Sequence, residues 1–169
     1  VAALSAQLAV ALGEIESVDS ILIVGAAPIN EAPMLALALR QAQRSGARVL
    51  VADPRPVRLP LAFRHVPLPP GELAPFLGAV VKRALSRPAV AGLSEASRTL
   101  WEGLPAEDTP DDLDWLAACR RPVIVCGTET VPDALPAFAA DCARLLAAGR
   151  ERGGLFYLLP GAGAFAAAL

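Results

Sequence analysis

The sequence contains little of what most catalytic centres require. Of its 169 residues, one is a histidine, His65, and three are cysteines, Cys119, Cys126 and Cys142. An iron–sulfur or zinc site needs about four soft ligands, and a nucleophile–base pair would have to use the single histidine. The cysteines show no C-x-x-C spacing. This cysteine pattern is typical of proteins in a reducing compartment. The sequence therefore predicts no metal site and no catalytic centre.

Long hydrophobic runs and an excess of charge are also missing. No apolar run approaches the ~20 residues that span a bilayer. The formal net charge is −2, which argues against nucleic acid or an anionic membrane as the main partner. Aromatic residues make up only 5% of the chain and apolar residues 54%, with much alanine. This composition favours tightly packed helices on a sheet over a large aromatic-lined cavity.

The usual phosphate-binding signatures are absent where they would be expected. The stretch Gly25-Ala-Ala-Pro28 lacks the G-x-G-x-x-G pattern of dinucleotide sites, and no Gly-Lys-Ser/Thr occurs anywhere. In the similar stretch Gly127-Thr-Glu-Thr130, Glu129 would repel an anion. A glycine after a buried strand more often allows a tight turn at the end of the strand than it binds a phosphate.

The stretch 21–33 organises the rest of the chain. Ile21–Val24 places apolar, mostly β-branched residues at consecutive positions, which predicts a strand buried on both faces. Asn30 is expected to cap the helix that follows, with Glu31 in its first turn, where a carboxylate complements the helix dipole. Pro33 loses little there by lacking an N–H.

The helix expected over 34–46 completes a β-α-β unit with the strand 48–52. Its apolar face is expected to comprise the residues Met34, Leu35, Leu37, Ala38, Leu39 and Ala42. Gly46 ends the helix, and Asp53 follows the second strand. The crossover of such a unit is right-handed.

The remaining pattern predicts one α/β domain over residues 1–169. Further helices are expected at 2–12, 72–85, 94–103, 111–119 and 133–149, and further strands at 64–68, 122–126 and 155–159. Because 122–149 repeats the strand–glycine–helix order of 21–46, we expect a three-layer, doubly wound, mainly parallel sheet of the Rossmann-like class. The expected strand order is 64–68 at the edge, then 48–52, 21–25, 122–126 and 155–159.

Ligands of such sheets bind outside the carboxyl ends of the two first strands, here the loops after Gly25 and Gly127. Asp53-Pro-Arg55 follows the second strand, where doubly wound folds often hold an acidic residue for a ribose hydroxyl. Alternatively, Asp53 caps a turn and Arg55 is solvated. We expect His65 to be a partly exposed bystander. The carboxylates of Asp108, Asp111, Asp112 and Asp114 fit no calcium loop and are expected to form a solvated face.

The two ends of the sequence suggest a piece of a larger protein. Val1 is not an initiator methionine, and the chain stops inside Ala164–Leu169, which has the composition of an unfinished helix.

Five stretches of the sequence form a set of motifs. The first two are Gly25-Ala-Ala-Pro-Ile-Asn-Glu-Ala-Pro33, before a helix with Arg40, and Ser45-Gly-Ala-Arg-Val-Leu-Val-Ala-Asp-Pro-Arg55. The others are Pro69-Pro-Gly71, Arg121-Pro-Val-Ile-Val-Cys-Gly127 and Leu158-Leu-Pro-Gly-Ala-Gly-Ala164. Together these stretches resemble the molybdopterin oxidoreductase family, and most closely its branch of the large iron–sulfur subunit of respiratory NADH–quinone oxidoreductase (complex I).

The resemblance implies that Gly25 and Ala27 would face the phosphate of a pterin guanine dinucleotide and Asp53 its guanosine end, with Arg55 able to attract an anion. Ala27, Val57 and Ala162 stand where the family has polar residues, and each loss removes a hydrogen bond worth roughly 1–3 kcal/mol. The resemblance therefore implies a vestigial cofactor site in a scaffold domain without cofactor. Iron–sulfur clusters would lie elsewhere in the full-length subunit. Its partners would be other subunits of the respiratory complex, on the cytoplasmic side of the inner membrane.

Other interpretations stay open at this point. Arg120-Arg-Pro-Val-Ile-Val-Cys-Gly-Thr128 also looks like the strand entry of the central domain of thiamine-diphosphate enzymes. A molybdopterin oxidoreductase domain that still binds its cofactor is a further possibility. An independent small-molecule-binding module is the last.

Overall fold

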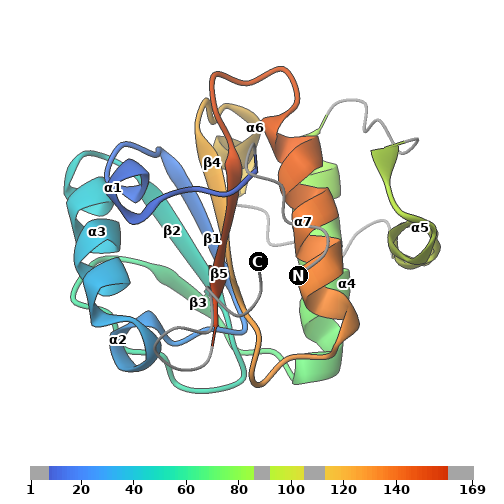
Figure 1. Cartoon of the computed structure of the whole chain (residues 1–169), viewed down its shortest axis with the longest axis horizontal. Helices are drawn as coiled ribbons and strands as arrows, with labels where there is room; N and C mark the ends of the chain where they lie inside the picture. Colours follow the sequence, from blue (N-terminus) through green and yellow to red (C-terminus); the bar gives the residue numbers. More distant parts are fainter. Residues whose placement is uncertain (1–7, 86–91, 105–112, 160–169) are drawn as a thin grey trace.

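The computed structural model describes residues 8–85, 92–104 and 113–159 of the chain and shows a five-stranded parallel sheet (Figure 1). Its strands are β1 (Ser20–Val24), β2 (Arg48–Ala52), β3 (Arg64–Val66), β4 (Pro122–Gly127) and β5 (Gly154–Leu158). They lie in the order β3-β2-β1-β4-β5, and every pair is parallel. The predicted doubly wound order is therefore confirmed.

Strand β1 is the centre of the sheet. Ile23 lies opposite Val51 of β2 on one side and Val125 of β4 on the other. Every residue of β1 and of β4 is buried. Consecutive apolar residues are needed here because helices cover both faces of the sheet.

The helices form the two outer layers (Figure 1). On one face lie α1 (Leu12–Ile15), α2 (Pro28–Glu31) and α3 (Pro33–Arg44). The other face carries η1 (Pro70–Glu72), α4 (Leu73–Ala84), α6 (Asp114–Ala117) and α7 (Ala134–Ala147), with α5 (Glu95–Glu102) outside α4 and α7. No helix within the described ranges is both long and apolar enough to cross a bilayer.

Alternate residues of the strands contribute their side chains to two separate hydrophobic cores, one on each face of the sheet. Leu22 and Ile124 point to the face of α4 and α7, where Phe138 is the largest fully buried side chain. Ile21 and Ile23 point to the other face and pack among residues of α3 such as Leu39. This alternation is the period-2 geometry of a strand whose two faces are both covered.

The helix predicted over 2–12 is wrong for its described part. Residues 8–10 run beside β5, with a parallel bridge from Ala9 to Leu155, and helix α1 begins only at Leu12. The Leu155 N–H donates to the carbonyl of Leu8 at 2.8 Å, and the Val10 N–H donates to that of Leu155 at 3.1 Å. This pairing satisfies backbone groups on an otherwise open sheet edge. Residues 1–7 lie outside the described part.

The predicted start of the helix after β1 is also wrong. Asn30 lies inside the short helix α2, whose N-cap is Ala27, and α3 follows with Ala32 as its N-cap and Pro33 as its first residue. Met34 and Leu37 do not join the buried face of α3; they are 62% and 54% exposed. The buried stripe contains Leu35, Ala38, Leu39 and Ala42, whose spacing already fills the helical face against the sheet.

Most other elements lie where they were expected. The predicted helix 94–103 is α5, and its N-cap Ser94 accepts a hydrogen bond from the backbone N–H of Ser97 at 3.3 Å. The helix expected over 111–119 is limited to Asp114–Ala117. The acidic stretch 105–109, Asp108, Asp111, Asp112 and the turn 160–163 lie outside the described residues.

Candidate functional site

The carboxyl ends of β1 and β4 form the switch point of the sheet, where doubly wound folds bind ligands. Gly25 leaves β1 with φ +61°, a left-handed conformation that disfavours a side chain. A Cβ added to Gly127 would lie 1.9 Å from the carbonyl oxygen of Gly25, and one added to Gly25 would lie 2.1 Å from Cγ1 of Val131. The two loops therefore touch each other at the point where a ligand would sit between them.

Asp53 lies at the carboxyl end of β2 and is fully buried. Its Oδ1 accepts hydrogen bonds from the backbone N–H of Arg55 at 2.8 Å and from Nε of Arg55 at 2.9 Å. Its Oδ2 accepts from Nη2 of Arg55 at 2.8 Å. The side-chain-to-backbone bond two residues on is the geometry of an Asx turn, so Asp53 does cap a turn. Arg55 is paired rather than merely solvated.

Glu31 extends this pair to the loop after β1. Its Oε1 lies 3.0 Å from Nη1 of Arg55 and accepts a hydrogen bond from the backbone N–H of Ala27 at 3.1 Å. The hydrogen bond with Asp53 raises the pKa of the Arg55 guanidinium; burial opposes this rise and the charges of Asp53 and Glu31 add to it. Glu31, Arg55, Asp53 and the Ala27 amide thus form one connected group, which we call the β1–β2 ion network.

The ion network brings together three of the four residues for which cofactor contacts were predicted, namely Ala27, Asp53 and Arg55. The fourth, Gly25, faces the second loop. Glu31, which was expected only to complement the helix dipole, is the residue that joins them. The available signal was topological: residues 31 and 55 both follow the carboxyl ends of neighbouring parallel strands.

His65 of β3 contacts the same region from the sheet edge. Its Nε2 lies 3.0 Å from the backbone carbonyl oxygen of Asp53, and the residue is partly buried. The loop after β2 is therefore held on three sides, by its own turn, by Glu31 and by the neighbouring strand.

The loop after β4 is closed without ion pairs in the described part of the chain. The hydroxyl of Thr128 donates to the carbonyl of Leu158 in β5 at 2.7 Å, while Glu129 is exposed. Cys126 at the end of β4 is buried, as predicted, and burial raises its pKa to about 12. A thiol of that pKa is protonated at neutral pH and is a poor nucleophile.

The interactions that hold the loops after β1, β2 and β4 together limit the chemistry available at the switch point. The donors that an anion would need, the Ala27 amide and the Arg55 guanidinium, already bind carboxylates of the chain itself. Across the described segments, no three histidine, cysteine or acidic side chains gather as metal ligands would. At this end of the sheet the described side chains bind one another and hold the loops after β1 and β2 together.

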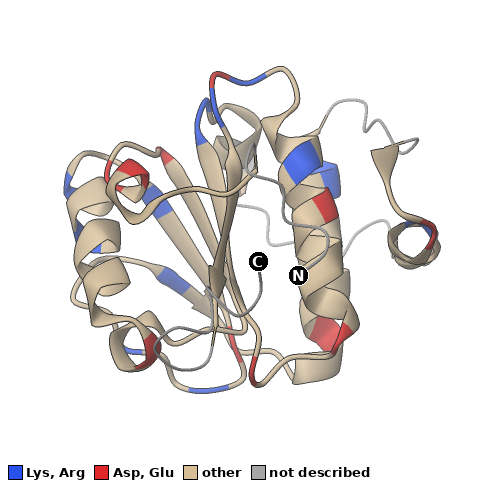
Figure 2. Cartoon of the chain, in the orientation of Figure 1, with Lys and Arg blue, Asp and Glu red and all other residues tan. Residues whose placement is uncertain are grey.

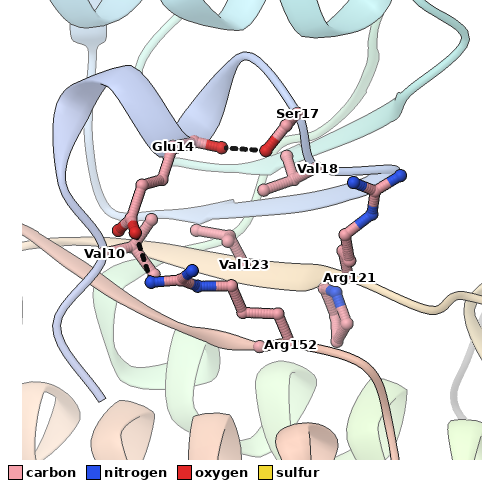
Figure 3. A pocket seen from close by; sticks show the side chains of 9 residues that line it. Val10, Glu14, Ser17, Val18, Arg121, Val123 and Arg152 are labelled. Carbon is pink, nitrogen blue, oxygen red and sulfur yellow. Dashed lines mark hydrogen bonds and ion pairs between the residues drawn. The ribbon is translucent and has the colours of Figure 1, made fainter. Parts of the chain in front are cut away.

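A small cavity lies at the opposite, amino end of the strands (Figure 3). Arg152 forms an ion pair with Glu14 beside it, and the Ser17 hydroxyl donates to the Glu14 carbonyl at 2.9 Å. The volume of the cavity is about 10 Å³, which is room for about one water molecule. The cavity is therefore too small for a metabolite.

Comparison with known proteins shows a likeness at the level of the fold. No protein-family model matches the sequence, and no curated protein matches it. Among solved structures, the chain is similar to a chain of the formyltransferase/hydrolase complex (FhcABCD) from Methylorubrum extorquens, determined in complex with methylofuran. The TM-score is 0.61 at 20% sequence identity, over 99% of this chain and 44% of that chain. At this identity the likeness shows the shared fold, and this chain spans less than half the length of the other.

The structural likeness corrects the family expected from the sequence. The interpretation as part of the large subunit of NADH–quinone oxidoreductase is wrong, and the respiratory function and partners inferred from it are withdrawn. The motifs that suggested it are short stretches at the ends of strands and helices. In the structure, Gly25–Pro33 leads from β1 through α2 to the start of α3, and Ser45–Arg55 contains β2 and the turn at its carboxyl end. Doubly wound folds share such turns because they share the geometry of the sheet.

Proposed function

We propose that this chain is a Rossmann-like domain of one subunit in a multi-subunit complex similar to the formyltransferase/hydrolase complex. The observation that carries the proposal is the likeness over 99% of the chain at a TM-score of 0.61. Because the match covers 99% of this chain, it includes both β-α-β halves of the sheet.

Within this proposal the domain contributes to assembly rather than to chemistry. Its usual ligand position is occupied by the β1–β2 ion network and by the contact between Gly25 and Gly127. Gly25, Ala27, Asp53 and Arg55 hold loops against the sheet in place of a cofactor. A domain whose switch point is closed still offers its outer helices and loops to neighbouring subunits.

The test is reconstitution with defined partners. The chain carries an affinity tag and is co-expressed with the proteins of its own organism that are most similar to the remaining subunits of the formyltransferase/hydrolase complex. We expect these subunits to co-purify in fixed stoichiometry by native mass spectrometry, and the purified assembly to bind methylofuran. The proposal is overturned if those subunits assemble with one another, as shown by a tag on one of them, and exclude this chain.

A further inference from the structure

The large apolar side chains that are exposed on the described surface lie in one short segment. Three large apolar residues are exposed in the described ranges: Ile29 at 37%, Met34 at 62% and Leu37 at 54%. Ile29 belongs to α2, and Met34 and Leu37 belong to α3, the helix that α2 contacts. Single exposed apolar residues are ordinary on a protein surface, whereas a cluster within nine residues marks a candidate contact surface.

The position of α3 in the fold leaves this cluster uncovered. Met34 and Leu37 are three residues apart and share one face of the helix, opposite the stripe that contacts the sheet. Figure 1 shows α3 as the outermost element on its side, whereas α4 and α7 on the other side have α5 outside them. Among the residues that the structure describes, the two helical layers thus differ in that a further helix covers one of them and none covers the other.

Basic residues continue the same exposed face. Arg40 and Arg44 follow Leu37 at helical spacing, are exposed, and form no ion pair within the described residues. Helix α3 contains no acidic residue, and Figure 2 shows only blue segments along it. Glu31, the nearest carboxylate in sequence, binds Arg55. The outer face of α3 therefore has an apolar half followed by a positively charged half.

We propose that the outer face of α3, formed by Met34, Leu37, Arg40 and Arg44, is together with Ile29 of the adjoining α2 a docking surface for a neighbouring subunit. The occupant is a segment of that subunit with apolar side chains beside carboxylates, which would pair with the arginines. Methionine and arginine are both enriched at protein interfaces, and truncation of a few central residues removes most binding energy. The proposal rests on the function proposed above, because it requires a multi-subunit complex.

A second copy of this chain is the poorer occupant. Packing α3 against another α3 would bring Arg40 and Arg44 against arginines or against Met34 and Leu37, with no carboxylate on either helix to pair with them. Charge complementarity thus favours a different protein. The patch alone is small, so it would form the centre of a larger contact rather than the whole interface.

The experiment repeats the reconstitution with the double variant Met34→Glu/Leu37→Glu and with Arg40→Glu/Arg44→Glu. Both change exposed side chains, and circular dichroism and thermal melting should show an intact fold. Recovery of the neighbouring subunits should fall at least about tenfold with either variant. The matched control is Ala137→Glu, which adds a carboxylate to an exposed position of α7 on the opposite side of the sheet and should recover wild-type amounts.

The possible results are distinct. Loss of assembly with both variants, and not with the control, supports the docking surface. Wild-type recovery with both variants overturns it, although the proposed function still stands. A dimer of the chain alone that dissociates with the variants identifies a second copy as the occupant and also overturns it. If even the wild-type chain fails to assemble, the proposed function fails.

Discussion

The loop after β1 and the loop after β4 occupy equivalent places in the two halves of the sheet, but they are closed by different interactions. The first is held by charge, through Glu31, Arg55 and Asp53. The second is held by shape, through the contact of Gly127 with Gly25, and by a hydrogen bond from Thr128. The carboxyl end of the sheet thus combines an electrostatic closure with a steric one.

This difference indicates how the domain accommodates a buried carboxylate at this end of the sheet. Buried charges are costly unless they are paired, and Asp53 is fully buried with three hydrogen bonds from Arg55. The steric closure does not depend on charge and keeps the neighbouring loop against Gly25. Removal of either closure should therefore have separate and measurable effects.

The largest effect is expected from the steric closure. In Gly127→Ala, the new Cβ would overlap the carbonyl oxygen of Gly25, a backbone atom that cannot move independently. We expect a loss of about 3 kcal/mol or more in the free energy of unfolding, measured by urea denaturation. Gly13→Ala is the control, because nothing lies within 4 Å of its new Cβ. Equal stability of the two variants would show that the loops do not touch.

The electrostatic closure should give the next largest effect. Asp53→Ala leaves the Arg55 guanidinium, whose side chain is 37% exposed, without its main partner. We expect a loss of about 2 kcal/mol, below the value for a fully buried pair because solvent screens Arg55. The double variant with Arg55→Ala should lose less than the sum of the single variants.

The control for the ion network is Glu129→Ala, which removes the exposed carboxylate of the other loop and should change stability by less than about 0.5 kcal/mol. Additive effects of Asp53→Ala and Arg55→Ala would contradict the connected network.

A smaller and pH-dependent effect is expected in the helix that follows the second loop. Asp141 of α7 is buried; burial opposes its ionisation, but hydrogen bonds from Ser97 and Ser94 and the charge of Arg144 outweigh this and lower its pKa below the ordinary value of 3.8. Its stabilising contribution is therefore present above that pH and is lost as the pH falls through the lowered pKa.

Asp141→Asn should accordingly destabilise the protein by about 1 kcal/mol at neutral pH and by less near pH 3. Urea denaturation of both proteins at several pH values measures this difference. A difference that stays constant down to pH 3 would show that the carboxylate charge does not anchor α5 to α7.

The sequence predicted the sheet because its signals were local and strong. Consecutive apolar residues in Ile21–Val24 require a strand covered on both faces, and the repeat of strand, glycine and helix at 122–149 required a second half. The path of residues 8–10 could not be predicted, because spaced leucines fit a helix as well as they fit an edge beside β5. The inferred family was wrong because short motifs at strand ends are set by the geometry of the fold and contain little information about function.

The site was predicted in part. Asp53 and Arg55 were identified from their place after a strand, and their mutual bonds are local. The bond from Arg55 to Glu31 joins two loops separated by a whole helix and strand, so no sequence spacing reveals it. The contact of Gly25 with Gly127 depends on how closely two strand ends that are far apart in sequence approach each other in the folded sheet, so no local sequence pattern reveals it.

The central claim is that the chain's own groups occupy the ligand position at the carboxyl end of the sheet. Calorimetric titration of the chain with GDP and with NADH tests it most directly, because both would place phosphate near Gly25 and Ala27 and a ribose near Asp53. We predict no saturable binding below about millimolar, since Glu31 and Asp53 already bind the available donors. Micromolar affinity that is lost in Asp53→Ala or Arg55→Ala would contradict this account.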